Sequence, residues 1–227
     1  MPSRRALFSQ VRSASGVVLA APLLAACGGG EEGVGAVEDL MREHGVLRRA
    51  ILVFRESAAR LRRGETVDAH ALRQTADLFR AFGEDYHERR LEEAYIFPAI
   101  RKAGGPAAGY VDTLVAQHNR GREIMNYAMS VTSKGSIGLD GPKLADALDR
   151  FELMYEHHAA REDTIIFPAW KAALGEHDLD EMGEKFEDIE KQQFGGDGFD
   201  QAVKQIDEIE QALGLADLGR FTAPPLR

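Results

Sequence analysis

The chain has 227 residues, of which 44% are hydrophobic and 29% are charged, so it can bury a sizeable core and form one ordinary domain with extensions. Its 28 Lys and Arg against 37 Asp and Glu give a formal charge of −9. A surface this acidic repels phosphate backbones, so we expect no nucleic-acid partner. The single cysteine, Cys27, excludes a disulfide framework within the chain, a thiolate zinc cluster and an iron–sulfur site.

The first 27 residues are typical of a bacterial export segment. Paired arginines, Arg4 and Arg5, precede an apolar stretch at residues 16–26, which is too short to span a bilayer as a helix and is typical of a signal-peptide core. The arginine pair resembles a twin-arginine export signal, and Leu24-Ala25-Ala26-Cys27 resembles a bacterial lipobox. The resemblance implies that residues 1–26 are a signal peptide removed during export.

The lipobox resemblance also implies that Cys27 carries a lipid on its sulfur. Lipid chains contribute about 0.8 kcal/mol per buried CH₂, so two or more chains hold a protein on a membrane while its domain stays in water. Residues 27–35 are rich in glycine and are expected to form a flexible tether. We therefore expect an exported bacterial lipoprotein, attached to the membrane through its lipid anchor alone and facing the periplasm or the cell exterior.

From Val37 onward, apolar residues recur at spacings of three and four, which predicts helices and no strands. Short connections between long helices favour antiparallel neighbours. The sequence therefore predicts an all-α fold, an up-down-up-down antiparallel four-helix bundle over residues 36–174, with a C-terminal helical extension and tail over residues 175–227. The expected helices cover residues 37–63, 67–103, 107–133 and 143–173, followed by one or two more within 176–214.

The apolar stripes of three predicted helices contain polar residues. His44 lies mid-stripe on the first helix, His118 on the third, and His158 with Glu162 on the fourth. One buried histidine is usually structural, but a buried carboxylate is costly unless it is paired or holds a metal. Because the inward faces of a bundle converge, the repetition on three helices predicts one shared metal site.

An internal repeat strengthens this prediction. Residues 86–100 align without gaps on residues 156–170. The alignment matches an acidic pair on each helix and a Phe-Pro pair five residues further on; the matched pairs are Glu92 with Glu162, Glu93 with Asp163, Phe97 with Phe167 and Pro98 with Pro168. Ordinary core packing rarely produces such a repeat, so the second helix is expected to contribute to the same site.

The chain has a histidine on the first and third helices, and a histidine followed by an acidic pair and Phe-Pro on the second and fourth. Over residues 37–174 this pattern resembles that of hemerythrin-like (HHE cation-binding) proteins. The resemblance implies a non-haem di-iron site, with two Fe ions about 3.5 Å apart bridged by the two glutamates. Imidazole suits iron, and the excess of nitrogen ligands differs from ferritin-like sites. The implied ligands are His44, His87, Glu92, His118, His158 and Glu162.

The second helix departs from the expected spacing. His87 and Glu92 are five residues apart, so on a straight α-helix they diverge by about 140°. A π-bulge between them would restore convergence, and such bulges favour functional sites. Glu93 as the bridge, or a contribution from Glu88, are the alternatives.

Two further departures concern the number of histidines. The gapless alignment matches His87 with His157, although His158 lies on the apolar stripe and four residues before Glu162. Oxygen-carrying hemerythrins have a second histidine one turn after the ligand on the third helix, and here that position is Arg122. This leaves four histidines, one per helix, unless His70 or His157 supplies a fifth.

The resemblance leads to an expected function. A di-iron site with fewer histidines has a further open coordination position, which favours reactive chemistry or a water ligand over simple storage. We expect a protein that binds O₂, NO or a peroxide for sensing, scavenging or storage. The alternatives are a di-iron enzyme (a peroxidase, or an NO-reducing or iron-repair protein) and a structural bundle whose site holds zinc or nothing. Any redox activity would require a separate reductant.

The lipobox prediction can be tested by replacing Cys27 with Ser. The thiol is the point of lipid attachment, so the Cys27→Ser variant should move from the membrane fraction to the soluble fraction after cell lysis. Immunoblots of the two fractions measure this. Continued retention of the variant on the membrane would contradict the lipobox assignment.

Overall fold

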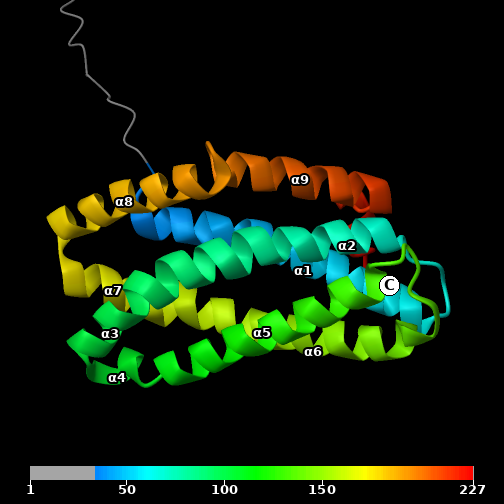
Figure 1. Ribbon diagram of the computed structural model, residues 1–227, viewed down its shortest axis with the longest axis horizontal. Coiled ribbons are helices and arrows are strands. Elements are labelled where there is room, and N and C mark those ends of the chain that lie inside the picture. Colours follow the sequence, from blue (N-terminus) through cyan, green and yellow to red (C-terminus); the bar gives the residue numbers. More distant parts are fainter. Residues whose placement is uncertain (1–33, 227) are drawn as a thin grey trace, which may run out of the picture. The chain divides into compact units, whose positions relative to one another are not determined.

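The computed structural model describes residues 34–226, and within them every regular element is helical (Figure 1). The all-α prediction is therefore confirmed. The elements are α1 (Ala36–Arg62), α2 (Ala69–Leu78), η1 (Phe79–Ile96), α3 (Phe97–Ala103), α4 (Gly105–Ala108), α5 (Val111–Thr132), η2 (Gly138–Asp140), α6 (Gly141–Arg161), η3 (Glu162–Ile166), α7 (Phe167–Leu174), α8 (Glu176–Phe194), α9 (Gly198–Leu213) and η4 (Leu218–Phe221).

Four long rods form the bundle. The first is α1, the second joins α2, η1 and α3 end to end, the third is α5, and the fourth joins α6, η3 and α7. Successive rods run in opposite directions (Figure 1), and each packs against its two neighbours around a common core. The predicted up-down-up-down bundle is present, and its inward faces bring side chains from all four rods together.

The second and fourth rods contain π-helical segments, η1 and η3, and both segments end directly before a Phe-Pro pair. Pro98 and Pro168 have no N–H, and a proline ring crowds the carbonyl four residues back. The preceding phenylalanines donate instead to carbonyls five residues back, Phe97 to Glu92 and Phe167 to Glu162. The Phe-Pro pair thus favours a wide turn at each glutamate.

The C-terminal helices α8 and α9 extend over the first and second rods (Figure 1). A left-handed Gly195, with φ of 73°, ends α8. The guanidinium of Arg49 on α1 donates to Glu210 at 3.0 Å and to Asp207 at 2.5 Å, both on α9. Ile206 of α9 is completely buried. The extension is therefore packed into the same hydrophobic core as the bundle.

The predicted signal peptide and lipidated Cys27 lie outside the described residues. Among residues 34–226, none of the helices combines the length and the apolar character needed to cross a bilayer.

The packing of α9 generates a stability prediction. Replacing Ile206 with Ala removes a fully buried side chain and should lower the free energy of unfolding by about 2–5 kcal/mol. The exposed Lys204 of the same helix provides a control, since Lys204→Ala should change the free energy of unfolding by less than about 0.5 kcal/mol. Chemical denaturation measures both. Equal stability of the two variants would show that α9 does not contribute to the core.

Candidate metal centre

The six side chains named as ligands by the sequence pattern converge in the bundle core. Each of the four rods contributes at least one of them, and none is more than 4% exposed. The set consists of His44 from α1, His87 and Glu92 from η1, His118 from α5, His158 from α6 and Glu162 from η3. Groups of these residues place ligand atoms within 4.8 Å of one another. The geometry therefore fits a metal site.

The cluster has two halves, each built around a pair of imidazoles. In the first half-site, the Nε2 atoms of His44 and His87 lie 3.0 Å apart. The Nε2 of His87 lies 3.5 Å from Glu92 Oε1, and that of His44 lies 3.6 Å from Glu162 Oε2. Both carboxylates therefore face the first half-site.

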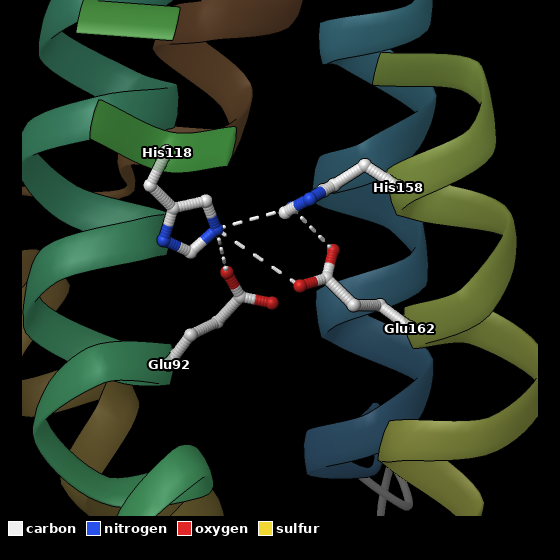
Figure 2. Close-up of side chains that lie close together, drawn as sticks. All are labelled: Glu92, His118, His158 and Glu162. Atoms are coloured by element: carbon white, nitrogen blue, oxygen red, sulfur yellow. Dashed lines mark hydrogen bonds and ion pairs between the residues drawn. The ribbon is translucent and has the colours of Figure 1, made fainter. Parts of the chain in front are cut away.

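The second half-site contains His118 and His158, whose Nε2 atoms are also 3.0 Å apart (Figure 2). His118 Nε2 lies 3.3 Å from Glu92 Oε2 and 3.9 Å from Glu162 Oε1. His158 Nε2 lies 2.9 Å from Glu162 Oε2. Glu92 and Glu162 are thus shared between the half-sites, in the positions that bridging ligands of two metal ions would take.

Each imidazole is oriented by an oxygen acceptor at its other nitrogen. The four Nδ1 atoms lie 2.5–3.0 Å from acceptor oxygens; the pairs are His44 with Asp163, His87 with Glu43, His118 with Glu93 and His158 with Gln117. We assign the proton to Nδ1 from this network, because each acceptor requires a donor. Each Nε2 then presents a lone pair to the centre, which is the form of histidine that binds metals.

The carboxylates at the centre have no hydrogen-bond partners. All four oxygens of Glu92 and Glu162 are buried and make no hydrogen bond within the described residues. Burial and the nearby Glu92 raise the pKa of Glu162 well above its ordinary value. Burial and the neighbouring His118 lower the pKa of His158 to about 3, so this imidazole is neutral. Against the effect of burial, Glu92 raises the pKa of His87 well above its ordinary value, and Glu88 does the same for His118. A bound cation would displace these protons and take the Nε2 atoms and the carboxylate oxygens as its donors.

Aromatic rings close the centre on both sides. Phe97 stacks on His118 with ring centroids 5.5 Å apart, and Phe167 stacks on His44 at 5.4 Å. Tyr155 stacks on His158 at 5.8 Å. Each of these three rings is at most 4% exposed. The Phe-Pro pairs thus shape the backbone at the glutamates and also keep water from the imidazoles.

The π-helical turn accounts for the unusual spacing on the second rod. In η1 the hydrogen bonds span five residues, so His87 and Glu92 lie one wide turn apart. On the fourth rod the chain is α-helical up to Arg161, so His158 lies one ordinary turn before Glu162. The structure therefore places His158 at the centre, whereas the gapless alignment matches His157. His157 is exposed, and its Nδ1 lies 3.0 Å from the Arg161 guanidinium.

The other candidate ligands lie at the margin of the centre or outside it. Glu93 accepts from His118 Nδ1 at 2.8 Å and so faces away from the shared carboxylates. Glu88 and Glu93 are both ion-paired with Arg122, at 3.1 and 2.6 Å. Although Glu88, Glu93 and His118 could form a cation site by distance alone, the guanidinium already supplies the positive charge there. His70 is exposed at the start of α2.

The structure reveals supporting residues that the sequence interpretation missed. Arg48, four residues after His44, donates to Asp163 at 2.5 Å. Arg122, four residues after His118, donates to Glu93 at 2.6 Å. Each arginine thus holds the carboxylate that orients the histidine one turn before it. The sequence does contain a signal for this arrangement, a Glu or Gln, a His and an Arg at identical spacing on the first and third helices.

The bundle centre therefore has an approximate twofold symmetry that relates the first rod to the third and the second rod to the fourth. His44 corresponds to His118 and His87 to His158, as their hydrogen-bond partners show. The symmetry is broken in charge at two positions. Glu43 holds His87, whereas the neutral Gln117 holds His158. The buried Glu88, which follows His87 and lies 3.9 Å from His118 Nδ1, has Ala159 as its counterpart after His158. The two half-sites are thus alike in their ligands but unlike in their surroundings.

Glu162 provides the first test of the centre. Glu162→Ala removes a shared carboxylate and should lower the metal affinity by at least about 10–100-fold, the range observed for residues that merely support ligands. The exposed Glu156 lies on the same rod, so Glu156→Ala should retain full occupancy. Elemental analysis of the purified variants measures occupancy, and equal values would contradict the assignment.

The adjacent histidines provide a second test. His158→Gln should lose metal because Nε2 of His158 faces Glu162 at 2.9 Å, whereas His157→Gln changes an exposed side chain and should retain it. Metal titration of both variants, with circular dichroism to verify that the helices are intact, measures the difference. Loss of metal in the His157 variant alone would reverse the assignment.

Comparisons with known proteins agree with this geometry. The hemerythrin HHE cation-binding domain family matches residues 35–170 and, in a second match, residues 109–214. The chain is also similar to uncharacterized protein Mb2018 of Mycobacterium bovis and to uncharacterized proteins MT2051 and Rv1995 of Mycobacterium tuberculosis. Each is 38% identical over 237 aligned residues, which cover 96% of this chain and 90% of the relative. No solved structure matches significantly. The chain belongs to the hemerythrin HHE cation-binding family.

Proposed function

We propose that this chain is a non-haem di-iron protein that binds O₂, NO or a peroxide for sensing, scavenging or storage. One observation supports the proposal above all others. Four imidazole Nε2 atoms converge in one buried place with four carboxylate oxygens that accept no hydrogen bond from any residue the structure describes. Each half-site offers two imidazoles, and the two carboxylates lie between the half-sites. This arrangement suits two cations better than one.

Iron is favoured by the chemistry of the donors. Imidazole and carboxylate together suit iron, whereas structural zinc prefers a closed set of four Cys or His ligands. The six side chains supply each half-site with two nitrogens and a share of two carboxylates, which leaves coordination positions for a small ligand. When bound, the iron pair would supply the capacity to bind and reduce such a ligand.

The surrounding residues would control this chemistry. Four oxygen acceptors fix the ring orientation of the histidines; they belong to Asp163, Glu43, Glu93 and Gln117. Such acceptors also raise the basicity of the imidazoles that would bind a metal. Phe97 and Phe167 cover the imidazoles and exclude bulk water. A buried centre closed by aromatic rings admits a diatomic molecule or a peroxide more readily than a large substrate.

We further propose that the domain works outside the cytoplasm as a lipid-anchored protein. The proposal rests on the twin arginines, Arg4 and Arg5, and on Cys27 at the end of the short apolar stretch. Membrane attachment would occur through the lipid alone, and a reductant would be a separate partner.

The proposed function can be tested on the full chain by measuring its metal content and visible spectrum, first reduced without air and then exposed to air. We expect about two irons per chain, the number of metal ions bridged in a two-metal site, and new charge-transfer bands in air. Return of the starting spectrum after removal of oxygen supports a binding protein.

The alternatives give different results in the same experiment. Irreversible oxidation, or steady turnover of added peroxide or NO, would identify an enzyme. No iron, or a single zinc with full stability after chelation, would identify a structural bundle and overturn the proposal. The Glu156→Ala variant, altered at an exposed position, should reproduce the behaviour of the unmodified protein throughout.

A further inference from the structure

A surface groove lies between α5 and α6, beside the second half-site. Its volume is about 890 Å³, within the range of small-molecule sites in proteins. Along α5 the lining extends from Tyr110, the residue directly before the helix, to Ile124, a distance of about 21 Å along a helix axis. The groove is therefore long enough for an extended small molecule, and it lies outside the metal centre.

The groove is positively charged although the chain carries a formal charge of −9. Its lining includes three arginines, Arg120 from α5 and Arg150 and Arg161 from α6, and no carboxylate among the described residues. Arg120 is paired with Glu123 of its own helix. Arg161 bends back along α6 and donates to the His157 carbonyl at 3.2 Å. The groove thus concentrates positive charge on an acidic protein.

The walls between the arginines are apolar. Leu114, Ile124, Leu153 and Met154 line the groove, and Leu153 is 62% exposed. Mostly apolar walls with a few polar groups are common in small-molecule sites. A ligand that fits needs an apolar body to cover these side chains and a negative group to meet a guanidinium, for which a carboxylate has the matching bidentate geometry.

We propose that this groove binds a small amphipathic carboxylate, a molecule with an extended apolar chain and one carboxylate group. The apolar chain would cover Leu153 and Met154, and the carboxylate would pair with Arg150 or Arg161. This site is separate from the proposed di-iron function and does not depend on a bound metal.

Gln117 connects the groove to the metal centre. Its side chain lines the groove, and its Oε1 accepts from His158 Nδ1 at 3.0 Å. It is the one neutral member among the four acceptors that orient the histidines. A ligand in the groove would therefore lie against the residue that holds His158.

A second copy of this chain fits the groove less well. A twofold interface places the same patch against itself, so the arginines of the two copies would face each other and repel. A membrane surface also fits less well, because a bilayer meets a convex or flat face, whereas these side chains line a groove.

The test uses the full-length protein and decanoate as the probe, below its micellar concentration, in isothermal titration calorimetry. We expect saturable binding of one decanoate per chain that weakens as salt increases. The neutral analogue decanol should bind at least tenfold more weakly. The double variant Arg150→Gln/Arg161→Gln should raise the Kd for decanoate about tenfold or more, because the charged hydrogen bonds are lost.

The matched control is Arg89→Gln/Arg101→Gln. It removes the same number of charges from exposed arginines outside the groove, paired with Asp85 and Asp112, and should bind decanoate as the unmodified protein does. Three results would overturn the proposal: an equal loss of affinity for decanoate in both double variants, equal affinities of the unmodified protein for decanol and decanoate, or no saturable binding of decanoate. Two other results would also overturn the proposal. In the first, sedimentation shows a dimer of the unmodified protein that the Arg150→Gln/Arg161→Gln variant does not form. In the second, the protein binds vesicles of anionic phospholipid but does not bind decanoate.

Discussion

The burial of two carboxylates in the core of the bundle is the constraint on which the rest of the structure depends. Glu92 and Glu162 are fully buried, and none of their oxygens makes a hydrogen bond within the described residues. Such groups are costly unless positive charge lies close by. Three sets of side chains surround the carboxylates in turn. The four imidazoles face them, oxygen acceptors orient the imidazoles, and arginines hold two of those acceptors.

Much of the fold and of the centre could be predicted from the sequence. The three- and four-residue apolar spacing specified the four rods, since each rod must bury one face. Polar residues on those faces, such as His44 and Glu162, were conspicuous because an apolar stripe rarely contains them. The repeated acidic and Phe-Pro pairs identified Glu92 in the same way. These signals are local, so one sequence was sufficient to read them.

The supporting residues could not be predicted because their roles depend on which rods are neighbours. Asp163 orients a histidine 119 residues away, and Arg48 reaches the same carboxylate across 115 residues. In the sequence Asp163 stands out only as part of the repeated acidic pair, and Arg48 only by the spacing that it shares with Arg122. Neither signal tells which side chain the residue contacts. The identity of the fourth-rod histidine was also ambiguous, since the alignment assumed equal winding and the second rod is wider between His87 and Glu92 than the fourth is before Glu162.

The different partners of His87 and His158 have a consequence for how strongly each imidazole would hold a cation. Glu43 is a buried carboxylate against His87, whereas Gln117 offers His158 only an amide oxygen. A carboxylate partner makes an imidazole a stronger electron donor than an amide does. We therefore expect His87 to hold a cation more firmly than His158 does. In the proposed di-iron centre, the two ions would then exchange with solution at different rates although their ligands are nearly identical.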